Sequence, residues 1–266
     1  MNIDRRWLFL LLALSVTLPF VFPFKLKIMP RRPVRAAHAF VETIPNGSLA
    51  LLSFDYGPAT KVELHPMAVA MLHQCFRKNI KVVGMALDPA GQAIGLEAFH
   101  QVAPQYNKVE GTDWAHLGYK AGNEAVVVAL GLDFKGTFPV DSHGTPTANL
   151  PVMKNIKRLQ DFAYAASFSA GKPGALEHIR LTHSAYGLPL IVGATAVQVP
   201  EYYPYYEAGQ LKGLLGGLRA AAEYEVQIGI EGTAQAGMGA QSVAHLTIAG
   251  LIILSNILYF WEKWRR

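Results

Sequence analysis

Two long apolar runs, one near each end of the chain, constrain most strongly how this sequence can fold. They cover residues 7–24 and 243–261, and neither contains Asp, Glu, Lys or Arg. A helix needs about 17–25 mostly apolar residues to cross the hydrocarbon core of a bilayer, and both runs just reach that length. The sequence therefore predicts a globular domain tied to a membrane at both ends.

The first run allows two interpretations. It follows Arg5 and Arg6, as the apolar core of a cleaved secretory signal would. No small-x-small cleavage site follows it, and Lys25 and Lys27 come instead, which favours an uncleaved anchor. Whether it is cleaved stays open at this point.

The second run has the ending that a membrane helix should have. It closes in aromatic residues followed by a basic tail: Tyr259, Phe260, Trp261, Lys263, Trp264, Arg265 and Arg266. Aromatic rings at the headgroup level and cytoplasmic basic residues are typical of membrane helices. A buried core helix is the alternative, and it fits badly with a basic chain terminus.

The net charge of +5 gathers beside the two runs. The basic tail indicates a cytoplasmic C-terminus, which would place the domain outside, whereas the basic residues within 25–35 favour the opposite orientation. We predict an integral protein of the bacterial cytoplasmic membrane with its domain on the outer, periplasmic face. The basic residues are interpreted as membrane flanks, because the domain shows no basic stripe with interleaved aromatics, and no nucleic acid is expected.

The middle of the chain alternates short apolar runs with longer segments of helical periodicity. The expected strands are 48–54, 81–87, 162–168 and 190–196, and the expected helices are 61–78, 95–106, 175–186 and 206–227. Such alternation is typical of a parallel sheet with helices on both faces. We predict a Rossmann-like or flavodoxin-like three-layer α/β domain with about five mainly parallel strands.

The predicted order of segments follows from these patterns. The residues divide into an N-terminal transmembrane anchor (1–24), a basic stalk (25–45), the α/β domain (46–228), a flexible Gly/Ala-rich linker (229–242), and a transmembrane helix with its basic tail (243–266). The segment 124–132 fits a strand or a helix equally well, because its valines favour a strand and Gly122-Asn123 can begin a helix.

Polar residues that follow the predicted strands form the candidate ligand site. In open parallel sheets, ligands bind beyond the C-terminal ends of the strands. The candidates are Asp55, Tyr56, Asp88, Lys120, Thr195 and Gln198. The two aspartates fit equally well as turn residues that accept backbone N–H bonds.

A second candidate surface is a cluster of tyrosines after the last of these strands. It comprises Tyr202, Tyr203, Tyr205 and Tyr206, interrupted by prolines and expected on a loop. A ligand lid, a protein interface and rings at the headgroup level are all compatible with it, and we favour an interface because tyrosine is a preferred anchor there.

Recognisable catalytic patterns are absent from the sequence. Cys75 is the only cysteine, and the nine histidines form no H-E-x-x-H. No G-x-G-x-x-G, P-loop or G-x-S-x-G occurs. We assign no catalytic residue, metal or cofactor. A hydrolase would require Ser53 or Ser167 to meet a histidine within hydrogen-bond reach.

Four segments of the domain carry a family resemblance. Residues 53–58 (SFDYGP), 82–87 (VVGMAL), 117–122 (LGYKAG) and 202–219 resemble a family of uncharacterised bacterial membrane-anchored α/β proteins. The resemblance implies a prokaryotic membrane setting and no activity.

The leading hypothesis is a non-enzymatic scaffold or accessory subunit of a membrane complex, partnered by the bilayer and by other subunits or a second copy. A small-ligand sensor or binding module using a pocket at the strand ends is the alternative.

Overall fold

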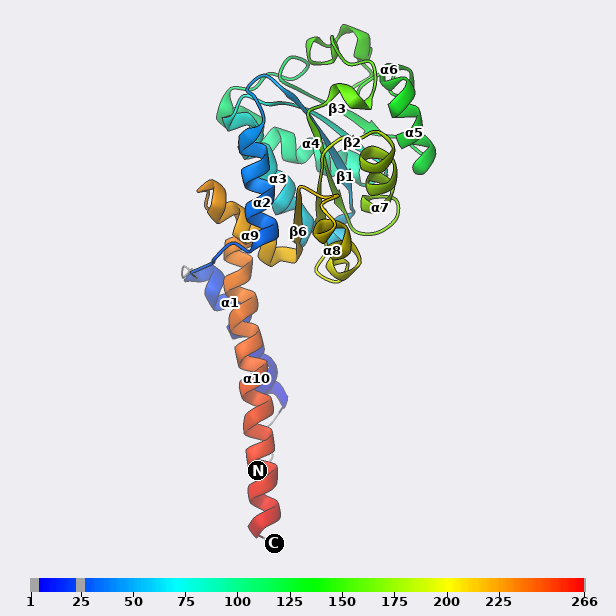
Figure 1. The fold of residues 1–266 in the computed structure, drawn as a ribbon. Coiled ribbons are helices and arrows are strands. Elements are labelled where there is room, and N and C mark those ends of the chain that lie inside the picture. The colour runs from blue at the N-terminus through cyan, green and yellow to red at the C-terminus, as the bar shows by residue number, and fades with distance from the viewer. Residues whose placement is uncertain (1–4, 23–26, 266) are drawn as a thin grey trace. The chain divides into compact units, whose positions relative to one another are not determined.

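The computed structural model describes residues 5–22 and 27–265 and divides into two units (Figure 1). Residues Ile28–Gly232 form one unit, which we call the α/β domain. The other unit, which we call the membrane unit, contains helices α1 (Arg5–Val21) and α10 (Thr233–Arg265). The two units are described separately below.

A six-stranded parallel sheet forms the centre of the α/β domain. Its strands are β1 (Leu49–Asp55), β2 (Lys81–Ala86), β3 (Trp114–Tyr119), β4 (Tyr164–Ser169), β5 (Leu190–Ala194) and β6 (Gly213–Gly216). The spatial order β3-β2-β1-β4-β5-β6 is that of Rossmann-like sheets. The predicted parallel α/β sheet is confirmed, and the predicted strand number of about five is wrong by one.

The sixth strand lies inside the segment predicted as a single helix, residues 206–227. Helix α8 (Val199–Glu207), strand β6 and helix α9 (Gly217–Ile228) occupy that region instead. A side chain at Gly213 would place its Cβ 2.3 Å from the Cβ of Ala37, and Gly217 has a φ of +67°. The glycines therefore allow close approach and a sharp turn, which a helical reading of the apolar spacing missed.

One face of the sheet is covered by four of the described helices. They are α2 (Arg32–Thr43), α3 (Lys61–Arg77), α4 (Gly91–Val102) and α9. Phe54 of β1 lies against Phe99 of α4 with ring centroids 5.9 Å apart, and Tyr164 of β4 donates to Met71 Sδ of α3. Helix α2 buries Val34, Ala37 and Val41. Residues 28–45 of the predicted stalk are therefore part of the folded domain.

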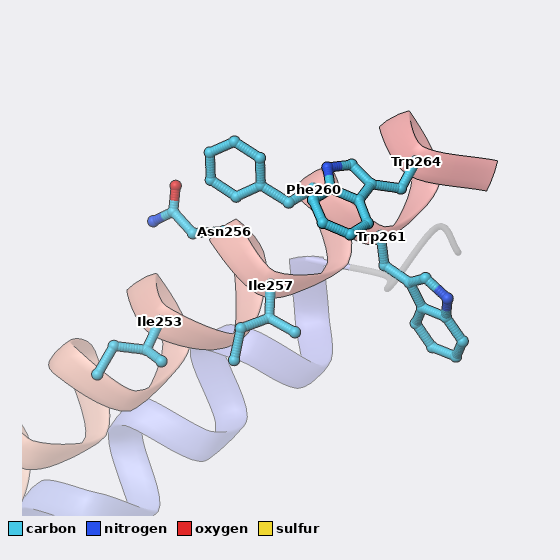
Figure 2. A pocket seen from close by; sticks show the side chains of 6 residues that line it. All are labelled: Ile253, Asn256, Ile257, Phe260, Trp261 and Trp264. Atoms are coloured by element: carbon cyan, nitrogen blue, oxygen red, sulfur yellow. The ribbon is translucent and has the colours of Figure 1, made fainter. Parts of the chain in front are cut away.

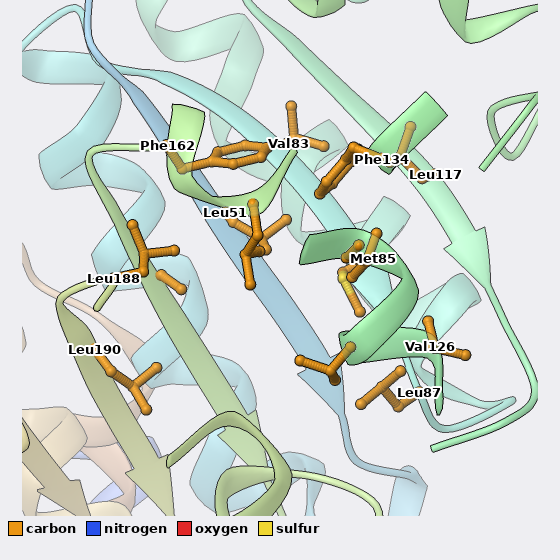
Figure 3. Close-up of a cluster of buried hydrophobic side chains, with 14 of the residues drawn as sticks. Leu51, Val83, Met85, Leu87, Leu117, Val126, Phe134, Phe162, Leu188 and Leu190 are labelled. Carbon is orange, nitrogen blue, oxygen red and sulfur yellow. The ribbon is translucent and has the colours of Figure 1, made fainter. Parts of the chain in front are cut away.

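The opposite face buries a core of aliphatic and aromatic side chains (Figure 3). Leu51 and Val83 of the sheet pack there with Val126, Phe134 and Leu188. The covering elements are α5 (Glu124–Leu132), α6 (Phe134–Thr137), α7 (Ala175–Glu177), the π-helix His178–Ala185 and α8. The ambiguous segment 124–132 is thus a helix.

Short 3-10 turns connect these elements. They are Pro58–Thr60, Ala103–Tyr106, Thr147–Asn149, Pro151–Met153 and Leu159–Asp161. The last three lie within the long connection between α6 and β4, where the sequence is rich in Pro, Gly, Thr and Asn.

Among the described residues of the membrane unit, one helix is long and apolar enough to cross a bilayer, by length and composition. That segment is Thr233–Trp261 of α10. Helix α1 packs against α10 but has 17 residues and contains Pro19. At about 1.5 Å per residue it is about 25 Å long, short of a core of about 30 Å. The expectation of two transmembrane helices is therefore wrong, and part of the first predicted run, residues 23–24, lies outside the described residues.

The predicted flexible linker 229–242 is helical for most of its length. Helix α10 begins at Thr233 and continues without a break into the apolar segment. The alanine, glutamine and methionine residues between the glycines of this region favour a helix, and the long helix that follows extends it.

Candidate functional site

The boundary between β1 and β4 is where the strand order reverses, and it is the usual ligand position in such sheets. Asp55 ends β1 there and is buried. Its Oδ1 accepts hydrogen bonds from Ser53 Oγ at 2.9 Å and from the Leu87 N–H at 2.7 Å. Half of this carboxylate is therefore fixed by the sheet itself.

The other carboxylate oxygen of Asp55 faces His178, the first residue of the π-helix. The distance from Asp55 Oδ2 to His178 Nε2 is 3.6 Å, which is too long for a hydrogen bond but brings acid and imidazole together. His178 is buried as well, and its Nδ1 lies 2.9 Å from Thr182 Oγ1. The result is a buried carboxylate–imidazole pair, which we call the Asp55–His178 pair.

Neither candidate nucleophile meets a histidine. Ser53 gives its hydroxyl hydrogen to Asp55, and Ser167 Oγ makes no hydrogen bond to the described residues. The condition that a serine hydrolase would require is not met in this arrangement.

The remaining strand-end candidates lie apart from one another. Tyr56 is buried and its hydroxyl lies 3.1 Å from His65 Nδ1; burial, with Glu97 and Asp55 nearby, raises the pKa of Tyr56 well above its usual value. Asp88 accepts the Ala90 N–H at 2.8 Å, as a turn residue does.

Lys120, Thr195 and Gln198 complete the predicted set. Lys120 is exposed and lines a separate cavity of about 590 Å³ beside α5 and α6. Thr195 and Gln198 lie 3.1 Å apart through Oγ1 and the side-chain amide. Of the six predicted ligand residues, all of them described, only these two contact each other by a hydrogen bond, so the structure does not gather the six into one site.

The tyrosine cluster lies on helix α8 rather than on a loop. Tyr202 belongs to the core, and burial raises its pKa to about 12, assisted by Glu201 and Glu177. Tyr205 and Tyr206 pack partly against the same core. Tyr203 is the most open of the four, with 44% of its surface exposed.

Beside Tyr203, a cavity of about 490 Å³ lies at the C-terminal end of β6, and we call it the arginine pocket. The side chains that line it and carry charge are all arginines: Arg31, Arg32 and Arg219. Its other lining residues include Val34, Val199, Tyr203 and Leu214. The pocket is thus built from the start of α2, the start of α8, strand β6 and the first turn of α9.

A buried carboxylate positions two of these arginines. Glu223 on α9 is buried, and its Oε1 accepts from Arg31 Nε at 2.7 Å and from Arg219 Nε at 3.0 Å. Its Oε2 accepts the Arg31 N–H at 3.0 Å. Because each guanidinium carries five N–H donors and gives Glu223 the one on Nε, the terminal amino groups keep their own donors.

Arg32 adds a third positive charge to the pocket lining. Among the described residues, Arg32 makes no ion pair. Glu63 lies nearby, where it accepts the Ala196 N–H at 2.8 Å. Three guanidiniums against two carboxylates leave an excess of positive charge at the pocket.

This site is not apparent from the sequence, because Arg31 and Arg32 fit a membrane flank and Arg219 fits one long helix. Within the part of the chain that the structure describes, no group of three His, Cys, Asp or Glu side chains is placed to hold a metal ion. Comparisons of the chain with family models, curated proteins and solved structures find no match. The geometry of the site itself therefore carries the functional argument.

Proposed function

We propose that this protein is a membrane-tethered α/β binding module that holds an anionic ligand in the arginine pocket. The observation that carries the proposal is a set of three guanidiniums on a cavity of about 490 Å³ at the strand ends. Guanidinium groups match carboxylate and phosphate geometry, and cavities of roughly 300–1,000 Å³ are typical of small-molecule sites. This site differs from the six strand-end residues predicted from sequence, but it belongs to the same class of function.

Helix α10 would supply the tether. Its apolar segment is followed by Lys263, and the basic tail favours a cytoplasmic C-terminus. On this proposal the α/β domain and its pocket lie on the outer face of a bacterial cytoplasmic membrane.

Titration of the full-length chain in detergent with inorganic phosphate tests the proposal. Replacing Arg32 by glutamine should raise the Kd about tenfold, because a charge-assisted hydrogen bond is worth about 1.5–3 kcal/mol. Arg35→Gln is the matched control: Arg35 lies on the same helix and is exposed, but it does not line the pocket. Equal affinities of the two variants, or no phosphate binding by the natural chain, would contradict the proposal.

A role as an accessory subunit of a membrane complex is the second candidate, and Asn256 favours it. This side chain lies in the apolar part of α10 beside a groove of about 510 Å³ formed with Ile253, Ile257 and Phe260 (Figure 2). The Asn256 amide donates to the Ile252 carbonyl at 2.8 Å, and its own oxygen accepts no hydrogen bond from the described residues. Polar side chains in membrane helices form hydrogen bonds to neighbouring helices.

Molecular mass in mild detergent tests this second candidate. The natural chain should run as a complex, and Asn256→Leu should shift it toward the monomer, whereas the neighbouring Ser255→Ala should not. A monomer for the natural chain would exclude the accessory role through α10.

A further inference from the structure

We infer that the ligand of the arginine pocket is a lipid that ends in a phosphate monoester. This inference rests on the proposed anion binding and adds two features of the ligand: the apolar chain and the form of the phosphate. Each feature follows from different residues of the pocket.

The apolar chain follows from the uncharged part of the lining. Ala196 and Tyr203, which are exposed, and Val199, which is half-buried, line the same cavity as the three guanidiniums, whereas the lining residues Val34 and Leu214 are buried. A small inorganic anion would leave this apolar surface in contact with water. An amphiphile covers it, and each Å² of apolar surface removed from water contributes about 25 cal/mol.

The phosphate monoester follows from the number and placement of the guanidiniums. A monoester carries a charge of about −1.5 to −2 at neutral pH and three terminal oxygens. A phosphodiester keeps one charge and two such oxygens. Arg31 and Arg219 are held by Glu223 through Nε, and Arg32 adds a third cation, so the pocket lining offers as many guanidiniums as a monoester has terminal oxygens.

The source of such a ligand follows from the chain itself. The α/β domain continues into the membrane unit at both of its ends. That unit carries the helix that is long and apolar enough to cross a bilayer. A chain that carries such a helix has membrane lipids available to it, so we assign a membrane lipid as the source, and soluble phosphate esters are the competing source.

A titration series with the full-length chain in neutral detergent tests the inference. The probes are dioctanoyl phosphatidic acid, dioctanoyl phosphatidylglycerol, glycerol 3-phosphate and inorganic phosphate. Phosphatidic acid should bind about tenfold more tightly than either phosphatidylglycerol or glycerol 3-phosphate. Arg32→Gln should lower the affinity for phosphatidic acid about tenfold, and Arg35→Gln should leave that affinity unchanged.

A second variant separates the lipid chain from the phosphate. Val199→Thr keeps the shape of the side chain but replaces one methyl group by a hydroxyl in the pocket wall. This variant should lower the affinity for phosphatidic acid about threefold and leave the affinity for glycerol 3-phosphate unchanged.

Each of three other outcomes would overturn a different part of the inference. Equal affinity for phosphatidic acid and glycerol 3-phosphate would overturn the lipid assignment and leave the anion site standing. Equal affinity for phosphatidic acid and phosphatidylglycerol would overturn the monoester assignment. If none of the four probes binds, the proposed function fails together with this inference.

Discussion

Two polar clusters lie at the C-terminal edge of the same sheet. One has buried titratable groups that face each other, and the other has arginines that line an open cavity. At the end of β1, Asp55 and His178 are 2% and 1% exposed and face each other. At the end of β6, the arginines line an open cavity and keep donors that Glu223 does not use. In this Rossmann-like sheet the expected ligand position is therefore occupied by buried side chains, whereas the cavity lined by arginines lies at the sheet edge.

The closure at β1 and β4 has a local cause. After β4, Ser169 Oγ accepts the Ala175 N–H at 3.0 Å, and Glu177 accepts the Gly174 N–H at 2.8 Å. These bonds fix the start of α7 and set the following π-helix over Asp55. The backbone N–H groups of residues 174 and 175 are thus already satisfied.

The largest expected effect comes from opening the closed cluster. Asp55→Ala would leave the Ser53 hydroxyl, the Leu87 N–H and His178 without their carboxylate, at a cost of about 3–5 kcal/mol in the free energy of unfolding. Urea unfolding of the full chain measures this cost, with Asp88→Ala in the nearby turn as the milder control. Phosphate affinity should stay unchanged under conditions in which the variant is folded. A folded Asp55→Ala protein that no longer binds phosphate would contradict the claim that the two clusters have separate roles.

A substitution at the sheet edge should disturb the open cluster next most strongly. Gly213→Val would force the new side chain against Ala37 and move α2, which carries Arg32, away from β6. Overpacking of this kind costs about 1–3 kcal/mol, and phosphate affinity should fall with it. Gly171→Ala is the control, since a Cβ there meets open space. A Gly213→Val protein with full stability and affinity would show that α2 does not hold the pocket.

Acid should weaken the α/β domain through His116, a buried histidine of β3 that lies outside both clusters. Burial, with His143 as a smaller cause, lowers the pKa of His116 to about 3 from an ordinary value of 6.5. The unfolded chain therefore binds this proton more readily, so stability falls as the pH drops from about 6.5 toward 3, by up to about 1.4 kcal/mol per pH unit.

His116→Asn should remove that share of the pH dependence. Asparagine keeps an acceptor for the Gly118 N–H, which His116 Nδ1 binds at 3.0 Å, but it does not titrate. Unfolding free energies between pH 7 and pH 5 check this, and an unchanged slope in the variant would contradict the assignment.

The smallest effect should distinguish charge from geometry in the pocket. Arg219→Lys keeps the positive charge and loses the planar fork, so phosphate affinity should fall by about threefold to fivefold with little change in stability. Arg35→Lys is its control. An affinity equal to that of the natural chain would mean that the pocket uses charge alone.

Much of the fold could be predicted from the sequence because its signals are local. The apolar runs before Asp55 and Asp88 are short and bounded by turn residues, and both are strands within one or two residues of the prediction. Strand β6 was missed because Gly213–Gly216 is short and its leucines continue a helical spacing into α9. Its glycines are required by the approach of α2, which is a tertiary constraint.

The candidate site was less predictable for the same reason. Asp55 was singled out correctly as a strand-end residue, but its partner His178 arrives from a distant π-helix. Arg31 and Glu223 are 192 residues apart in the sequence, so no local spacing of residues predicts their contact. The positive charge of residues 31 and 32 is evident in the sequence. Without the fold, however, membrane flanks are enough to explain it.

The position of a bound oxyanion shows directly which of the two clusters binds anions. Anomalous scattering from tungstate, in crystals of the full-length chain, locates such an anion without assuming a ligand. We expect one strong peak among Arg31, Arg32 and Arg219. A peak at the Asp55–His178 pair with none in the arginine pocket would contradict it.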